Sequence, residues 1–206
     1  MTRSKSIALV DSGCANIGSL VSILDYCGYD WTLVTSSNAS GDYYGMILPG
    51  VGSFDNFMSS ISVGSRLGDF VRNSIFQTKI PCLGICVGMQ ALALSSEEGV
   101  MPGLGVIPQQ VVKLSDESPS VNMGWRTVTG QGDVFDTFPS VSSEFYFVHS
   151  FGYRSVDSTY CKAVSQFRGP VAALVGHENI LGVQFHPERS GIAGIRFFEE
   201  FLEACK

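Results

Sequence analysis

The sequence predicts an α/β domain built on a central sheet that is partly parallel and partly antiparallel, with helices on its faces. In the first 90 residues, short runs of Val, Ile and Leu alternate with segments whose apolar residues recur at helical spacing, which is typical of parallel strands joined by helices. From about residue 95, short apolar runs separated by glycines indicate antiparallel or mixed pairing. The chain closes with one more strand and an amphipathic helix.

Four strands are expected in the first half, each marked by a short apolar run, at residues 7–10, 31–34, 46–48 and 81–85. Between the first two, apolar residues at positions 17, 20, 21 and 24 predict a helix that Gly28 is placed to end. The third strand runs into a turn-rich Pro-Gly-Val-Gly loop at 49–52, and a helical stretch follows toward Phe70 and Ile75.

The second half is expected to hold shorter strands, around Val106 and at residues 111–112, 125–128, 145–148 and 180–185. The last element is predicted to be a helix from about residue 191 to 204, because Ile195, Phe198 and Leu202 share one helical face.

Composition limits the kind of protein this can be. With 206 residues, 45% of them hydrophobic and 16% charged, the chain can bury one substantial core, and we expect a single domain over residues 1–206. Thirteen Lys and Arg against 19 Asp and Glu give a net charge of −6. Since no basic run could follow a phosphate backbone, nucleic acid is not an expected partner.

Membrane insertion and secretion are not expected either. The apolar runs are strand-sized, far below the roughly 20 residues that span a bilayer. Asp11 interrupts the first run before it reaches the length of a signal peptide. Six cysteines are too few for a disulfide scaffold in a chain of this length. We therefore expect a cytoplasmic protein whose cysteines are thiols.

The segment Gly-Ile-Cys-Val-Gly at 84–88 has the pattern of a nucleophile elbow with sulfur in place of oxygen. Glycines two positions before and after Cys86 allow a sharp strand-to-helix turn without Cβ clashes. The thiol then lies beside a helix N-terminus, which favours the thiolate and can stabilise an oxyanion. Cys86 is therefore the candidate nucleophile; the alternative is a small buried thiol without a catalytic role.

A thiol nucleophile needs a general base and a group that orients the base. His186 follows the last predicted strand, and Glu188 comes two residues later, after Pro187. In an extended segment such a pair projects from the same side, so the carboxylate can hold the imidazole while its other nitrogen faces the thiol. The alternative is a strand-end histidine beside a solvated glutamate. His177 is expected in a surface turn, and His149 either lines a pocket or is a satisfied, half-buried histidine.

No metal and no cofactor are expected. Cys82 and Cys86 lie four positions apart in a strand, about 13 Å along it, which is too far for both to bind one zinc ion. The Gly-Val-Gly stretch at 50–52 lacks the Lys-Ser/Thr of a phosphate loop, and the dinucleotide fingerprint is incomplete.

Two motifs together, residues 84–88 and Gln-Phe-His-Pro-Glu at 184–188, resemble those of the class I (triad) glutamine amidotransferases. Four more resemble the glutaminase subunits of imidazole glycerol phosphate synthases, which supply ammonia to a cyclase in histidine biosynthesis. They are Asp-Ser-Gly-Cys-Ala-Asn at 11–16, Leu-Pro-Gly-Val-Gly-Ser-Phe at 48–54, Asn-Met-Gly-Trp at 122–125 and Tyr-Phe-Val-His-Ser-Phe at 146–151. The resemblance spans nearly the whole chain.

This resemblance implies a class I glutamine amidotransferase-like (flavodoxin-like) three-layer fold with a central mixed sheet flanked by helices. It implies Cys86 as nucleophile, His186 as general base and acid, and Glu188 as the orienting carboxylate. Backbone N–H groups of Gly52 and Val87 are expected to form the oxyanion hole. The residues that match those holding L-glutamine in the family are Gly52, Gln90, His149, Ser150 and Phe151.

By the same resemblance, glutamine is hydrolysed to L-glutamate and ammonia through a cysteine thioester, without a cofactor. The ammonia passes through a channel to a cyclase subunit, in a heterodimer that makes imidazole glycerol phosphate and AICAR. The isolated subunit is expected to be nearly idle until its partner is loaded.

Two segments depart from the family's pattern. Val-Asn-Met-Gly-Trp-Arg at 121–126 stands where Pro-His-Met-Gly-Trp-Asn is common, and the tyrosine that usually follows the glycine of the first motif is absent. These differences leave open which synthase is served. One alternative is a paralogue that supplies ammonia for amidino-sugar synthesis in surface polysaccharides; another is a catalytically silent, partner-binding module. Other enzymes with a cysteine elbow on a similar sheet, such as γ-glutamyl hydrolases, also stay open.

Overall fold

The computed structural model describes residues 6–132, 134 and 138–205, and its centre is an eight-stranded sheet. The strands of this sheet are β1 (Ser6–Val10), β2 (Trp31–Val34), β3 (Tyr43–Gly50), β4 (Cys82–Cys86), β8 (Thr129–Gly130), β11 (Cys161–Gln166), β12 (Pro170–His177) and β13 (Ile180–Val183). Their order is β2-β1-β3-β4-β13-β12-β11-β8. The strands from β2 to β13 are parallel, and the rest pair antiparallel, so the predicted mixed sheet is confirmed.

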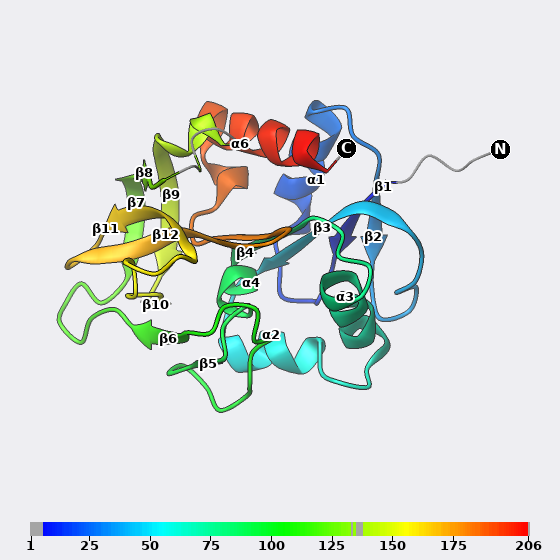
Figure 1. The fold of residues 1–206 in the computed structure, drawn as a ribbon, viewed down its shortest axis with the longest axis horizontal. Helices are drawn as coiled ribbons and strands as arrows, with labels where there is room; N and C mark the ends of the chain where they lie inside the picture. Colours follow the sequence, from blue (N-terminus) through cyan, green and yellow to red (C-terminus); the bar gives the residue numbers. More distant parts are fainter. Residues whose placement is uncertain (1–5, 133, 135–137, 206) are drawn as a thin grey trace.

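Helices cover both faces of the sheet and complete three layers (Figure 1). On one face lie α1 (Ile17–Tyr26) and α6 (Gly191–Ala204). On the other lie α2 (Phe54–Ser60), α3 (Arg66–Phe76) and α4 (Val87–Gln90). Covering on both faces explains why β1 and β4 are almost continuously apolar and buried. No helix among the described residues is long and apolar enough to cross a membrane.

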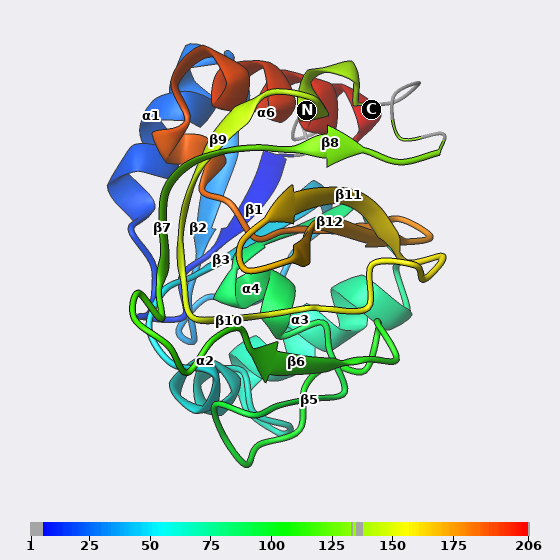
Figure 2. The same cartoon turned by 90° about the vertical axis from the view of Figure 1, so that its left-hand side faces the viewer.

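Two small sheets flank the antiparallel side of the central sheet. One is a two-stranded ribbon of β7 (Asn122–Thr127) and β9 (Glu144–His149), which run side by side in Figure 2. The other pairs β5 (Ser95–Ser96), β6 (Gln110–Lys113) and β10 (Phe151–Gly152). Two single turns of 3₁₀ helix, η1 (Pro139–Val141) and η2 (Pro187–Arg189), lie before β9 and after β13.

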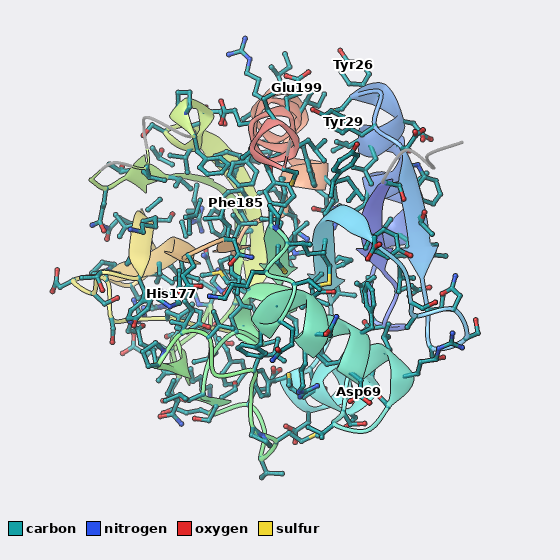
Figure 3. All side chains as sticks on the ribbon, turned by 45° about the vertical axis from the view of Figure 1, so that its right-hand side comes forward. Tyr26, Tyr29, Asp69, His177, Phe185 and Glu199 are labelled. Carbon is teal, nitrogen blue, oxygen red and sulfur yellow. The ribbon has the colours of Figure 1, made fainter. Side chains whose placement is uncertain are left out.

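An aromatic cluster fixes the segment that follows β13. Phe185 is fully buried in the interior (Figure 3), stacks on Phe145 at 4.0 Å between ring centroids, and meets Phe197 of α6 edge-on at 5.5 Å. Burying one such ring contributes about 1.5–3 kcal/mol. The cluster therefore holds the chain firmly on either side of Phe185.

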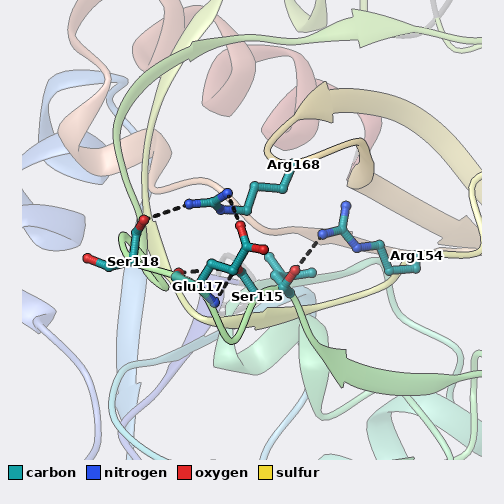
Figure 4. Close-up of polar contacts among 6 residues, drawn as sticks. Ser115, Glu117, Ser118, Arg154 and Arg168 are labelled. Carbon is teal, nitrogen blue, oxygen red and sulfur yellow. Dashed lines mark hydrogen bonds and ion pairs between the residues drawn. The ribbon is translucent and has the colours of Figure 1, made fainter.

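Two arginines fix the loop that leads from β6 into β7 (Figure 4). Arg154 donates from Nη2 to the Leu114 carbonyl at 2.7 Å. Arg168 donates from Nη2 to the Ser118 carbonyl at 2.8 Å and from Nη1 to Glu117 at 2.9 Å. The loop that precedes β7 is thereby held by contacts that no sequence pattern indicates.

Most predicted elements lie where expected, with three differences. The helical stretch toward Ile75 is divided into α2 and α3, because Gly64 turns the chain with a φ of +82° and Ser65 caps α3 by accepting from the Gly68 N–H. The region around Val106 is not a strand, since neighbouring backbone groups bond to residues 91–94 instead. The helix after the elbow, α4, is a single turn.

Candidate active site

The elbow at the end of β4 has the conformation that its glycines predict. Cys86 has a φ of +54° and a ψ of −108°, in the left-handed half of the map that residues with a Cβ rarely occupy. A Cβ on Gly84 would lie 2.6 Å from the Gly88 carbonyl oxygen, and one on Gly88 would overlap the carbonyl oxygen of Leu48. Both glycines are therefore required by the close approach of backbone to backbone.

His186, the candidate base, lies near Cys86 because β13 is the neighbour of β4. The two strands pair in parallel, with Ile85 opposite Val183, so both chains leave the sheet at the same edge. Cys86 is 4% exposed and His186 is 3% exposed. Residues one hundred positions apart are thus brought to one buried place by the strand order.

His186 and Glu188 form a buried hydrogen-bonded pair. Nδ1 of His186 lies 2.8 Å from Oε1 of Glu188, and the two side chains are 4% and 5% exposed. The sequence predicted this pair, but the extended backbone expected to bring the two side chains together is wrong. The chain turns into η2 at Pro187 instead. Ser190 stabilises this turn by donating to the His186 carbonyl at 2.6 Å.

The second nitrogen of His186 is available for proton transfer. Burial lowers the pKa of His186, but the Cys86 thiol and the Glu188 carboxylate outweigh it and raise that pKa to about 10. Because a carboxylate only accepts, Nδ1 carries the proton that faces Glu188. Nε2 is buried and has no hydrogen-bond partner in the described structure. Cys86 therefore raises the pKa of the ring without a well-formed hydrogen bond to Nε2.

A cavity of about 330 Å³ lies over Cys86 and His186. This volume is at the lower end of the range for small-molecule sites, about 300–1,000 Å³. All the residues predicted from the family to hold glutamine line it, and so does Val87. The full lining is Val51, Gly52, Cys86, Val87, Gln90, Glu98, Val121, Val148, His149, Ser150, Phe151 and His186.

The floor of the cavity is a network of buried amides. Gln90 donates from Nε2 to the Phe151 carbonyl at 2.9 Å and to Oε1 of Gln184 at 3.1 Å. Gln184 in turn donates to Sγ of Cys86 at 3.6 Å. The amide nitrogen of Gln90 is therefore engaged within the protein, which leaves its oxygen as the group it can offer a ligand.

Both ring nitrogens of His149 are likewise engaged, Nδ1 with the Phe151 carbonyl at 2.8 Å and Nε2 with Asn122 at 2.9 Å. Burial lowers the pKa of His149 to about 4, so the ring is neutral near pH 7. The sequence left two alternatives for His149, a residue that lines a pocket or a histidine whose hydrogen bonds are satisfied within the protein. The structure shows that it is both.

The loop at 49–52 contributes Val51 and Gly52 to the cavity that contains Cys86. Val51 donates its backbone N–H to the Cys14 carbonyl at 2.6 Å. Gly52 has a φ of +91°, which a residue with a side chain would adopt only under strain. Gly52 lines the cavity together with Val87, the first residue of α4, whose N–H has no acceptor within the helix.

Glu98 is a cavity residue that the sequence did not single out. Its Oε2 accepts from the backbone N–H of Phe54, at the start of α2, at 2.9 Å. In the sequence it is one of two glutamates in a polar turn, and only the tertiary structure places it over Cys86.

His177 lies away from this site. It is exposed at the end of β12 (Figure 3), as the sequence predicted. It lines a separate cavity of about 570 Å³ that contains none of the predicted site residues. Within the described parts of the chain, no group of three or more His, Cys, Asp or Glu residues is arranged to hold a metal ion.

Comparison with known proteins shows the family and the fold. A family model described as class-I glutamine amidotransferase matches residues 8–204. The chain is 36% identical over 203 residues to the imidazole glycerol phosphate synthase subunit HisH 2 of Methanococcus maripaludis, covering 96% of this chain and 98% of that protein. It is 35% identical to the imidazole glycerol phosphate synthase hisHF of Emericella nidulans, covering 98% of this chain and 38% of that protein. The solved structure of PurLQS from Thermotoga maritima shares the fold, with a TM-score of 0.75 at 19% identity and coverage of 98% of this chain and 100% of that chain.

Proposed function

The chain belongs to the class-I glutamine amidotransferase family, and we propose on this basis that it is the glutaminase subunit of an imidazole glycerol phosphate synthase. The observation that carries the chemistry is the buried His186–Glu188 pair beside Cys86, at the base of one cavity. The chain acts as one domain in the cytoplasm, where its six cysteines, all unpaired, remain thiols.

Cys86 attacks the carbonyl carbon of the glutamine side-chain amide as a thiolate, while its proton is held on Nε2 of the His186 imidazolium. Glu188 accepts from Nδ1–H and stabilises this imidazolium. The imidazolium then protonates the departing nitrogen, so that the C–N bond breaks, ammonia leaves and a γ-glutamyl thioester remains. His186 next removes a proton from the water that attacks the thioester, and the thiolate leaves as glutamate is released, which restores the starting pair of thiolate and imidazolium.

The negative oxygen of each tetrahedral intermediate is stabilised by backbone N–H groups of Gly52 and Val87. Both residues line the cavity beside Cys86. Each such donor lowers the barrier by about 3–4 kcal/mol in related oxyanion holes.

L-glutamine occupies the cavity above Cys86, in contact with Gly52, Gln90, His149, Ser150 and Phe151. Since both nitrogens of His149 are engaged, its contribution is the shape of the wall rather than a hydrogen bond from its ring. Glu98 also lines the cavity, and its carboxylate suits the α-ammonium group of the amino acid.

The cyclase binds over the β7–β9 ribbon and receives ammonia through a channel within the heterodimer. Exposed apolar side chains gather along this segment: Val121 is 38% exposed, Met123 57% and Trp125 52%. Such a group is unusual on a surface that contacts only water. Val121 also lines the cavity, so a partner bound here would lie at the cavity rim.

A second function is favoured by one observation: two of the departures from the family's pattern, Asn122 and Arg126, lie on the same strand as the exposed Met123 and Trp125. A paralogue that serves an amidino-sugar synthase would differ at its docking strand and keep its triad. A catalytically silent module is disfavoured by the intact His186–Glu188 pair beside Cys86.

The test is glutamate release from glutamine by the chain alone, with a histidine-pathway cyclase, and with that cyclase and its ribonucleotide substrate. Strong stimulation by the loaded cyclase is expected. Stimulation by an amidino-sugar synthase instead would overturn the histidine role and keep the triad. Cys86→Ala is the control: it should bind the partner and release no glutamate, and activity without Cys86 would refute the nucleophile.

A further inference from the structure

A line of side chains connects the ribbon to the cavity. Asn122, the first residue of β7, pairs with His149, the last residue of β9. Asn122 is 1% exposed, and Arg126, four residues later on the same face of the strand, is half-buried. Each of these side chains hydrogen-bonds to the next, and together they reach from the edge of the ribbon to the wall of the cavity.

The direction of every hydrogen bond in this line is determined. The Phe151 carbonyl can only accept, so Nδ1 of His149, at 2.8 Å, carries the proton. In a neutral ring Nε2 is then an acceptor, and Nδ2 of Asn122 donates to it at 2.9 Å. That orientation turns Oδ1 of Asn122 toward Arg126, whose Nε donates to it at 3.2 Å. A guanidinium only donates, which excludes the flipped amide.

The surroundings keep His149 neutral. Burial is the largest effect and lowers its pKa, the hydrogen bond to the Phe151 carbonyl raises it, and the charges of His186 and Arg154 lower it further. The charged or titratable groups around the ring and its cavity are His186, Arg154, Arg126, Glu98 and Cys86. Asn122, a neutral donor, is the partner that suits an uncharged ring with a lone pair on Nε2.

The same line continues beneath the cavity. The Phe151 carbonyl that accepts from His149 also accepts from Gln90, and Gln90 donates to Gln184, which donates to Cys86. The orientation of His149 is thus tied, through one shared carbonyl, to the amides that surround the nucleophile.

We propose that Asn122, held by Arg126, is a positioning residue that fixes His149 as the neutral Nδ1–H tautomer and thereby sets the wall of the glutamine cavity. The proposal rests on the proposed function only in assigning glutamine to that cavity. The tautomer and its dependence on Asn122 concern the chain alone, and they can be tested without any activity.

The decisive variant is Asn122→Asp, which keeps the shape of the side chain and replaces its donor by a second acceptor. His149 then faces an acceptor at each nitrogen, and only the doubly protonated ring satisfies both. The expected result is a rise in the His149 pKa from about 4 by roughly two units or more. The measurement is an NMR titration of the imidazole ¹⁵N signals of the full chain, with the three histidines assigned through single His→Gln variants.

In wild-type protein the ¹⁵N shifts should show a protonated Nδ1 and an unprotonated Nε2 for His149 at pH 7. An Nε2–H tautomer, or a His149 pKa that is the same in Asn122→Asp and wild type, would overturn the proposal. Neither result depends on glutamine hydrolysis, so a chain that proves inactive with every synthase would refute the proposed function and leave the positioning role standing.

Arg126→Met provides a second variant on a less buried side chain. It removes the donor that orients the Asn122 amide, and in the complex with the loaded cyclase we expect the KM for glutamine to rise roughly three- to tenfold with little change in kcat. Arg196→Met, an exposed arginine on α6, is the matched control and should change neither constant. Equal KM values for Arg126→Met, Arg196→Met and wild type would show that Arg126 does not position the site.

Discussion

Nδ1 of His186 lies 2.8 Å from Oε1 of Glu188 across a 3₁₀ turn, with both side chains almost completely buried. A turn that brings i and i+2 side chains together in the protein interior must be held by its surroundings. Here the stacked Phe185 on one side and the Ser190 hydroxyl on the other supply that support. The orientation of the pair is therefore fixed, and Nε2 is the ring nitrogen that remains for proton transfer.

Loss of the base should cost more than loss of the group that orients it. His186→Asn removes the imidazole that is paired with Glu188 and should lower kcat by about 10⁴-fold or more, whereas Glu188→Gln should lower it by roughly 10- to 1,000-fold. Glutamate release by the partner-bound protein measures both. Equal rates for Glu188→Gln and wild type would remove Glu188 from the triad.

The same pair should make stability depend on alkaline pH. The pKa of His186 is raised from 6.5 to about 10, so the folded state holds this proton more tightly than the unfolded chain. The stabilisation is therefore complete below about pH 6.5 and is lost as the pH rises toward 10. Urea unfolding at pH 6.5 and 9.5 should show a larger loss for wild type than for Glu188→Gln; the same loss in both would contradict the raised pKa.

The elbow glycines should not tolerate a methyl group. Gly88→Ala places a Cβ on the Leu48 carbonyl and should cost more than about 3 kcal/mol of the free energy of unfolding, or prevent folding. Gly18→Ala in α1 is the matched control, because the nearest atom to its new Cβ lies 4.0 Å away and its φ is not positive. That control should be neutral or gain up to about 1 kcal/mol, as alanine does in helices. Thermal or urea unfolding of both variants measures these changes, and an equally small effect for the two would contradict the prediction.

Docking on the ribbon can be tested with Trp125→Ala. The side chain is 52% exposed, so its loss should leave the stability of the isolated chain nearly unchanged and weaken binding of the cyclase roughly ten- to a hundredfold. Tyr26→Ala is the control, since Tyr26 is 72% exposed at the end of α1 (Figure 3). Titration calorimetry gives both affinities, and an equal small effect for the two variants would place the interface elsewhere.

Local patterns were sufficient to predict the parallel half of the sheet, the elbow and the final helix. Their residues carry the information themselves: apolar runs make buried strands, and Gly84 and Gly88 are needed by backbone contacts close to Cys86. The candidate triad residues were proposed from local patterns too, but the turn at Pro187 was not predicted, because the Ser190 side chain stabilises it.

Contacts distant in sequence explain what could not be predicted. Glu98 comes to the cavity through its bond to Phe54, and Asn122 reaches His149 through strand pairing. The local sequences around Glu98 and Asn122 are like those of ordinary polar residues in surface turns and at strand ends. Only the assembled sheet and ribbon decide which polar side chains meet inside the protein.

The neighbouring placement of β4 and β13 has a consequence for the protein's synthesis. The ribosome delivers Cys86 before half of the chain is made, but β13, which His186 follows, emerges near the end and must insert between β4 and β12. A nascent or truncated chain that lacks residues 180–188 has a thiol without its proton acceptor. By this order of synthesis, we expect ammonia release only from chains in which β13 has completed the sheet.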